Sequence, residues 1–260
     1  MKGLLYLVLA CGCATAGREE VVGGRPDGGG GGGGGSGTGK DAMVEPLPDA
    51  APLPDAPPGM QQVTLSQTTN NTMAVGLAIA CSSSILNVPI GTRDNSWYRV
   101  FKLSDYGIAG AFNVQRVTFY SDYAWGGTGV TQPATVKIGT YAGTLEADTL
   151  TVASITPITS KPITIPDADS SDGVDPPVIT DLTATIPAGA NLLVEIALPD
   201  GYNDGNFFYI GVSAGGETKK GYIRATPAGC NMTAPKSLTS ATGINRPDNS
   251  ILLTVTGTAM

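Results

Sequence analysis

Residues 61–260 contain many short segments in which hydrophobic and polar positions alternate with the period of a β-strand. The segments are rich in β-branched and aromatic residues, and turn sequences such as Pro187-Ala188-Gly189 separate them. No stretch carries a convincing helical stripe. The pattern therefore predicts an all-β fold, an antiparallel two-sheet sandwich that is jelly-roll-like. The expected strands cover 96–103, 114–120, 135–141, 191–198, 206–212 and 250–256.

The alternation is absent from residues 12–60. An unbroken glycine run occupies 28–35, and a tandem Pro-Leu-Pro-Asp-Ala sequence occupies 46–50 and 52–56. Glycine has no side chain to bury and loses much backbone entropy on ordering, whereas the proline repeats favour extended polyproline geometry. We therefore expect a disordered Gly-rich and Pro/Asp/Ala tether over 12–60, followed by the β-sandwich domain over 61–260.

Residues 1–11 have the order of a bacterial export signal. Lys2 supplies a positive charge, 3–10 is a short apolar stretch, and the sequence Val-Leu-Ala-Cys ends it at Cys11. This ending resembles the lipobox of bacterial lipoproteins, which implies a signal peptide over 1–11 and acylation of Cys11. Cys13 is a competing acylation site, but Cys11 would then fit poorly at the second place before it. The alternatives are an ordinary signal peptide cleaved elsewhere, or a cytoplasmic protein with a misassigned start.

The apolar stretch is too short to cross a bilayer, because a transmembrane helix needs roughly 20 apolar residues. The resemblance to a lipoprotein therefore implies that the chain touches the membrane through its N-terminal lipid only. It also implies a place in the bacterial cell envelope, lipid-anchored to the outer membrane and exposed at the cell surface.

Several segments of the expected domain are familiar as a group. They resemble an uncharacterised β-sandwich module of bacterial secreted and surface proteins, and the resemblance covers roughly 61–257. It implies an extracellular accessory domain and brings no catalytic residues. The segments that carry it are 95–101, 112–119, 187–196 and 222–225.

Composition excludes several classes of function. The chain has no histidine, so a Ser-His-Asp site or a His-ligated zinc is impossible. The net charge is −7 without a Lys/Arg cluster, which argues against nucleic acid as a partner. Residues 34–40 match the start of a phosphate-binding P-loop, but Asp41 stands where Ser or Thr is required, so we expect no nucleotide.

Glu195 is the carboxylate that a carboxylate-based hydrolase would use. It shares a strand face with Leu193 and Ala197. The alternative is a structural ion pair, because a buried carboxylate needs a cation such as an arginine. Arg99, on the Trp97 face of its own strand, also needs a partner, and we expect an ion pair rather than a catalytic acid.

The metal candidate is an acidic loop with oxygen ligands at Asp167, Asp169, Asp172 and Asp175, a spacing that suits calcium. The loop lacks the glycine and the distal glutamate of an EF-hand. A solvated hairpin loop is the alternative, and we expect no obligatory cofactor.

The ligand-binding candidates are aromatic residues on polar, Gly-rich loops: Tyr120, Tyr123 and Trp125 on one loop, and Tyr202 on another. Such rings stack on sugars or anchor a protein partner. The alternative is that Tyr123 and Trp125 fold back to cover an end of the sandwich.

Two cysteines, Cys81 and Cys230, lie outside the signal region. In an oxidising compartment two thiols of one domain tend to pair, so we expect a disulfide, with two separate thiols as the alternative.

Together these features predict a surface-anchored, non-catalytic binding or adhesion module for a glycan or protein ligand. A structural envelope lipoprotein is the alternative, and a carboxylate-based hydrolase is a further one. The fold itself does not choose among them, because sandwiches host many functions.

Overall fold

The computed structural model describes residues 13–15, 61–85, 88–127, 131–169, 177–225, 230–240 and 244–260. Several of the predicted features lie outside the described residues. These are the signal peptide over 1–11 with Cys11, the tether over 12–60 apart from Cys13–Thr15, and Asp172 and Asp175.

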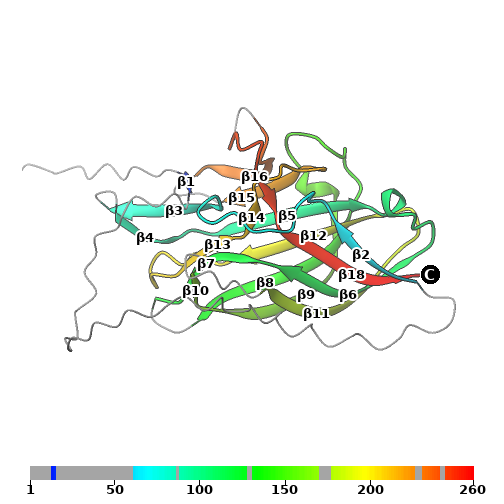
Figure 1. The fold of residues 1–260 in the computed structure, drawn as a ribbon, viewed down its shortest axis with the longest axis horizontal. Helices are drawn as coiled ribbons and strands as arrows, with labels where there is room; N and C mark the ends of the chain where they lie inside the picture. The colour runs from blue at the N-terminus through cyan, green and yellow to red at the C-terminus, as the bar shows by residue number, and fades with distance from the viewer. Residues whose placement is uncertain are drawn as a thin grey trace, which may run out of the picture.

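Two large antiparallel sheets face each other (Figure 1). The four-stranded sheet has the order β11 (Val178–Ile186), β6 (Phe112–Phe119), β18 (Leu253–Ala259) and β2 (Gln61–Ser66). The six-stranded sheet has the order β16 (Met232–Ser237), β15 (Gly221–Ala225), β5 (Asn95–Lys102), β12 (Asn191–Leu198), β8 (Thr131–Tyr141) and β9 (Ile155–Pro166).

Three small sheets complete the described part of the chain. Their strands, in sheet order, are β1 (Cys13–Thr15), β3 (Ile79–Ile85) and β4 (Val88–Thr92); then β10 (Ala168–Asp169), β7 (Ser121–Trp125) and β13 (Phe207–Ile210); then β14 (Val212–Ser213) and β17 (Ser250–Ile251). The helices of the described residues are two 3-10 turns, η1 (Leu103–Tyr106) and η2 (Val152–Ser154).

The strand order is that of a jelly roll. Numbered along the chain, β2, β5, β6, β8, β9, β11, β12 and β18 form one sheet with the order 1-8-3-6 and a facing sheet with the order 2-7-4-5. This is the order produced when one long antiparallel hairpin wraps into two layers. Strands β15 and β16 extend the second sheet beyond β5. The predicted antiparallel, jelly-roll-like sandwich is confirmed.

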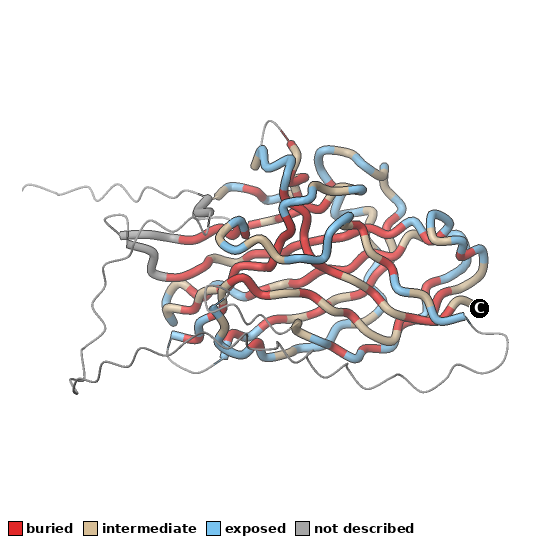
Figure 2. The backbone as a smooth tube through the Cα atoms, in the orientation of Figure 1, coloured by how far each residue is buried: buried red, intermediate tan, exposed pale blue. Residues whose placement is uncertain are grey.

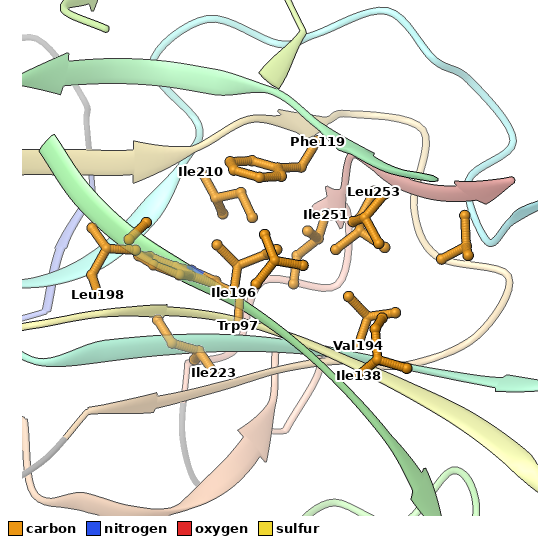
Figure 3. Close-up of a cluster of buried hydrophobic side chains, with 14 of the residues drawn as sticks. Trp97, Phe119, Ile138, Val194, Ile196, Leu198, Ile210, Ile223, Ile251 and Leu253 are labelled. Atoms are coloured by element: carbon orange, nitrogen blue, oxygen red, sulfur yellow. The ribbon is translucent and has the colours of Figure 1, made fainter. Parts of the chain in front are cut away.

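The main core fills the space between the two large sheets (Figure 2). Apolar side chains of β5, β8, β12 and β15 meet those of β6 and β18 there, as Figure 3 shows around Trp97. The Phe208 ring packs edge-to-face against Trp97 and Phe119, with ring centroids 5.4 and 6.3 Å apart. Edge-to-face contact suits the opposite charge of ring edge and ring face, and it adds to the stabilisation from burial.

A second buried cluster covers part of the outer face of the six-stranded sheet. It consists of Tyr98, Val100, Tyr141, Leu150, Leu193 and Tyr222, with Leu145 and Ile155 packed against it. Leu150 and its neighbours come from the connection between β8 and β9. Strand β12 is therefore buried on both faces at Leu193 and Val194, which explains its continuous apolar sequence.

The six expected strands are present; β12 has the expected bounds and the others have shifted ends. The 206–212 segment divides into β13 and β14, and the 250–256 segment divides into β17 and β18. Residues 121–125 were expected in a loop and instead form β7, which corrects the sequence prediction. Two long strands, β9 and β11, were missed, and β9 contains three prolines that argue against a central strand. It lies at a sheet edge, where proline is tolerated.

The predicted disulfide between Cys81 and Cys230 is confirmed, with the two Cα atoms 6.0 Å apart. It joins β3 to the residues that precede β16, across a sequence separation of 149.

Candidate functional site

The three-stranded sheet β10-β7-β13 lies at the end of the sandwich away from the C-terminus (Figure 1). Strand β6 begins beside the C-terminal strand, where Phe112 is opposite Ala259, and β7 follows the far end of β6. Strand β13 then pairs with β7 so that Trp125 is opposite Phe207 and Tyr123 is opposite Tyr209.

Alternation of side chains gives this small sheet two different faces. One face carries Ala124 and Phe208, which are both buried, and Phe208 packs there against Trp97 and Phe119. The other face carries Tyr123 and Trp125 from β7, and Phe207 and Tyr209 from β13. We call these four residues the aromatic face.

Three of the four rings of the aromatic face contact one another. Tyr123 packs edge-to-face against Phe207 and Tyr209, with centroids 6.3 and 6.4 Å apart. Tyr209 is only 7% exposed and belongs to the main core, and Tyr123 and Phe207 pack against that core. Trp125, by contrast, is 48% exposed. The face therefore passes from a fixed, buried side to a ring that is open to solvent.

Two carboxylates border the aromatic face. Asp169 of β10 is opposite Tyr123, and Asp167, two positions earlier, accepts a hydrogen bond from the Gly126 backbone N–H at 2.8 Å. Directly opposite residues of paired strands share a face, so Asp169 belongs to the side of Tyr123 and Trp125. Asp167 lies just before β10, and its bond to Gly126 places it beside the end of β7. Both aspartates are exposed. Burial, and then the charges of Asp169 and Asp167, raise the pKa of the Tyr123 phenol.

Close backbone contacts fix the chain just beyond Trp125. The Gly127 N–H donates to the Asn206 side-chain oxygen at 2.9 Å, which ties the end of β7 to the loop before β13. A Cβ atom at Gly127 would collide with the backbone oxygens of Asp204 and Gly205. Glycine is required at this position so that the two loops can approach, and the approach holds Trp125 opposite Phe207.

The other two aromatic candidates do not join the aromatic face. The ring of Tyr202 lies under the Arg93 guanidinium, 3.8 Å from the ring centroid, and Arg93 also pairs with Asp200 at 3.1 Å. Tyr120 precedes β7, and its backbone bonds to Leu252 and Gly211. Of the four predicted aromatic residues, the structure brings together Tyr123 and Trp125.

An open groove of about 680 Å³ lies on the outer face of the six-stranded sheet, beside the second buried cluster. Two carboxylates, Asp94 and Asp200, line it together with Arg224 and Lys137. Each carboxylate has an arginine near it, because Arg224 is 3.8 Å from Asp94 and Arg93 is 3.1 Å from Asp200.

Glu195 forms an ion pair, as expected, but with a lysine rather than an arginine. Its carboxylate is 3.0 Å from the Lys137 amine on the neighbouring strand and accepts a hydrogen bond from the Tyr98 hydroxyl at 3.2 Å. Arg99 points to the other face of the sheet and pairs with Glu217 at 3.1 Å. Glu195 and Arg99 therefore occupy separate structural ion pairs.

The calcium candidate and the expectation of no obligatory cofactor both stay untested. Within the described ranges, no group of three or more Asp, Glu, Cys or His residues could hold a metal ion. Asp167 and Asp169 border the aromatic face, while Asp172 and Asp175 lie outside the described residues. Among the helices of the described residues, none is long and apolar enough to cross a membrane.

Sequence reasoning missed Phe207 and Tyr209. Both stand at alternate positions of a segment that was expected to be a strand, so the signal for a shared face was present. What the sequence lacked was the partner strand, since β7 was expected as a loop. Comparison with family models, with curated proteins and with solved structures gives no match for this chain.

Proposed function

We propose that residues 61–260 form a non-catalytic glycan-binding module, carried at the bacterial cell surface by an N-terminal lipid. The observation that carries this proposal is the aromatic face, in which a half-exposed Trp125 is supported by partly buried Tyr123 and Phe207.

An exposed indole on a rigid base is suited to a sugar ring. The apolar face of the sugar covers the ring plane, and an aromatic side chain with only two χ angles loses little conformational entropy on binding. Trp125 stands opposite Phe207 across a strand pair, and the glycine contacts beyond it hold the backbone. Asp167 and Asp169, at the border of the face, offer carboxylate oxygens that accept hydrogen bonds from sugar hydroxyls.

Two further observations favour binding over hydrolysis. Glycoside hydrolysis uses a pair of carboxylates on either side of the scissile bond. In the open groove, Asp94 and Asp200 each form an ion pair with an arginine, Arg224 and Arg93 respectively. Glu195 is paired with Lys137 in the same way.

The anchor part of the proposal depends on the sequence. The Cys11 lipobox resemblance and the Gly- and Pro-rich stretch over 12–60 favour a domain displayed away from a membrane. A structural envelope component would share this anchor, and the grouping of Trp125 with Tyr123 and Phe207 on one sheet face is what favours binding over that alternative.

The test measures glycan binding by the full chain carrying Cys11→Ala, which removes the acylation site. A glycan array identifies a ligand, and its affinity is then measured for Trp125→Ala. We expect a loss of about fivefold or more, since stacking of a nucleic-acid base on an aromatic ring contributes about 1–3 kcal/mol and a sugar ring uses the same contact. Val152→Ala is the matched control, because Val152 is 52% exposed and lies on η2.

Unchanged affinity in Trp125→Ala would contradict the proposal. If the chain binds a protein instead of a glycan, and that binding requires Trp125, the proposed ligand class is wrong. The aromatic face would still be the binding site.

A further inference from the structure

Charge is distributed unevenly around the aromatic face. The three segments that build this end, 121–127, 167–169 and 202–209, contain four aspartates and no lysine or arginine. Asp122 accepts hydrogen bonds from Gly76 and is buried on the face that carries Ala124, so it does not reach the aromatic side. Asp167, Asp169 and Asp204 are exposed.

Arg93, in the loop between β4 and β5, already interacts with other side chains. Arg93 lies over the Tyr202 ring and pairs with Asp200. The segments that build the aromatic face thus place carboxylates, and no cation of their own, beside rings whose faces are also electron-rich.

We propose that the ligand of the aromatic face is a cationic glycan, a polymer of amino sugars that carry free, protonated amino groups. This inference rests on the proposed glycan-binding function and names its substrate class. A neutral sugar would use the rings alone, whereas a protonated amino sugar uses the rings and the carboxylates together.

The strand pairing places carboxylates and aromatic rings side by side. Asp169 is opposite Tyr123 on the adjacent strand, and Asp167 is held beside the residue that follows Trp125. The carboxylates of Asp169 and Asp167 therefore border the aromatic face near Tyr123 and near the end of β7. A sugar stacked on Trp125 would have an amino group within reach of Asp167 or Asp169, and a second unit would meet the other carboxylate.

Charge attraction and ring stacking act on the same ligand here. An ammonium near an aromatic face and an exposed carboxylate gains from both, and the carboxylate contribution weakens as salt rises. An N-acetylated sugar keeps the ring and loses the positive charge. The two forms of one oligomer therefore separate the contribution of the carboxylates from that of the rings.

The experiment compares β-1,4-linked glucosamine oligomers with their N-acetylated counterparts of equal length, titrated into the full chain carrying Cys11→Ala. We expect the free-amine oligomer to bind about tenfold more tightly at low salt, with the preference shrinking as salt is added. Trp125→Ala should weaken binding of both oligomers.

The decisive variants are Asp169→Asn and Asp167→Asn. Asparagine keeps an oxygen that can accept the Gly126 hydrogen bond, so the loop is preserved while the charge is lost. Each change should lower affinity for the free-amine oligomer and leave affinity for the N-acetylated one unchanged. Asp181→Asn is the matched control, because it removes one charge at an exposed position of β11.

Equal affinity for the two oligomers, with binding that still requires Trp125, would overturn the cationic ligand and leave the glycan-binding function standing. A free-amine preference that survives in the Asp167→Asn, Asp169→Asn double variant would also overturn it, since the attraction would then come from the net charge of the whole chain. Binding of neither oligomer, nor of any glycan on the array, would overturn both proposals.

Discussion

At the scale of single residues, burial decides what each charged or aromatic side chain does. Arg99 is completely buried, and its guanidinium bonds to Ser250, to the backbone oxygens of Lys219 and Ile251, and to Glu217. The Glu217 carboxylate also accepts the Gly221 N–H. Burial raises the pKa of Glu217, although Arg99 opposes that shift.

The first prediction follows from this buried pair. Glu217→Ala leaves the Arg99 charge without its carboxylate and should lower the free energy of unfolding by about 3–5 kcal/mol. Asp148→Ala is the control, because it breaks the exposed pair with Lys220 and should cost no more than about 1 kcal/mol. Urea denaturation of both variants measures the difference, and equal small losses would show that the buried pair is not required.

The second prediction concerns pH. Burial raises the pKa of Tyr106 to about 12, and its hydroxyl donates a hydrogen bond to the Ser66 carbonyl at 2.7 Å. An unfolded tyrosine ionises near 10, so the stability contributed by this partly buried phenol is complete below pH 10 and is lost as pH rises towards 12. The free energy of unfolding should therefore fall over this range, and less steeply in Tyr106→Phe. An identical slope in the variant would exclude Tyr106 as a cause.

At the scale of secondary-structure elements, the local sequence pattern predicts the strands well, but it does not predict which strands pair. Strand β12 was expected with its observed bounds, because its apolar run is continuous and turns flank it. Strand β9 was missed because prolines interrupt it, and β7 was missed because Asp122 and two following glycines give it the composition of a loop. The aromatic face depends on β7 pairing with β13, which lies far along the chain, and no local signal encodes that partner.

The third prediction tests the covalent link between elements. The Cys81–Cys230 disulfide closes a long loop, with a sequence separation of 149. In the entropic model, such a bond lowers the entropy of the unfolded chain and thereby raises the free energy of unfolding by up to about 5 kcal/mol. Cys230→Ser should lower the melting temperature sharply, and a reducing agent should have the same effect on the wild-type chain. A melting temperature that neither treatment changes would contradict this stabilising role.

At the scale of the whole molecule, the sandwich class was readable from sequence and the site was not. Alternating strands with turns between them predict two layers, and the strand order of the structure is that of a jelly roll. The order cannot be read from the strands because it depends on which distant segments pair. Trp125 is a candidate from its residue type and its Gly-rich neighbours. Phe207 and Tyr209 are assigned to the site only by the pairing of β13 with β7.

The fourth prediction concerns the attachment of the whole molecule. Cys11 should be acylated, because the residues before it resemble a lipobox. Metabolic labelling with a fatty acid should mark the wild-type chain and miss Cys11→Ala. Equal labelling of both chains would contradict the assignment.

The central claim is that a glycan covers the aromatic face, and the two tryptophans of the chain allow a direct measurement. Trp97 is 1% exposed and Trp125 is 48% exposed, so a soluble quencher such as acrylamide should reach Trp125 almost alone. Acrylamide quenching is therefore recorded with and without a saturating glycan ligand. The account predicts that the ligand protects the exposed tryptophan and lowers the quenching constant towards that of Trp125→Phe. A bound glycan that leaves the quenching constant unchanged would contradict it.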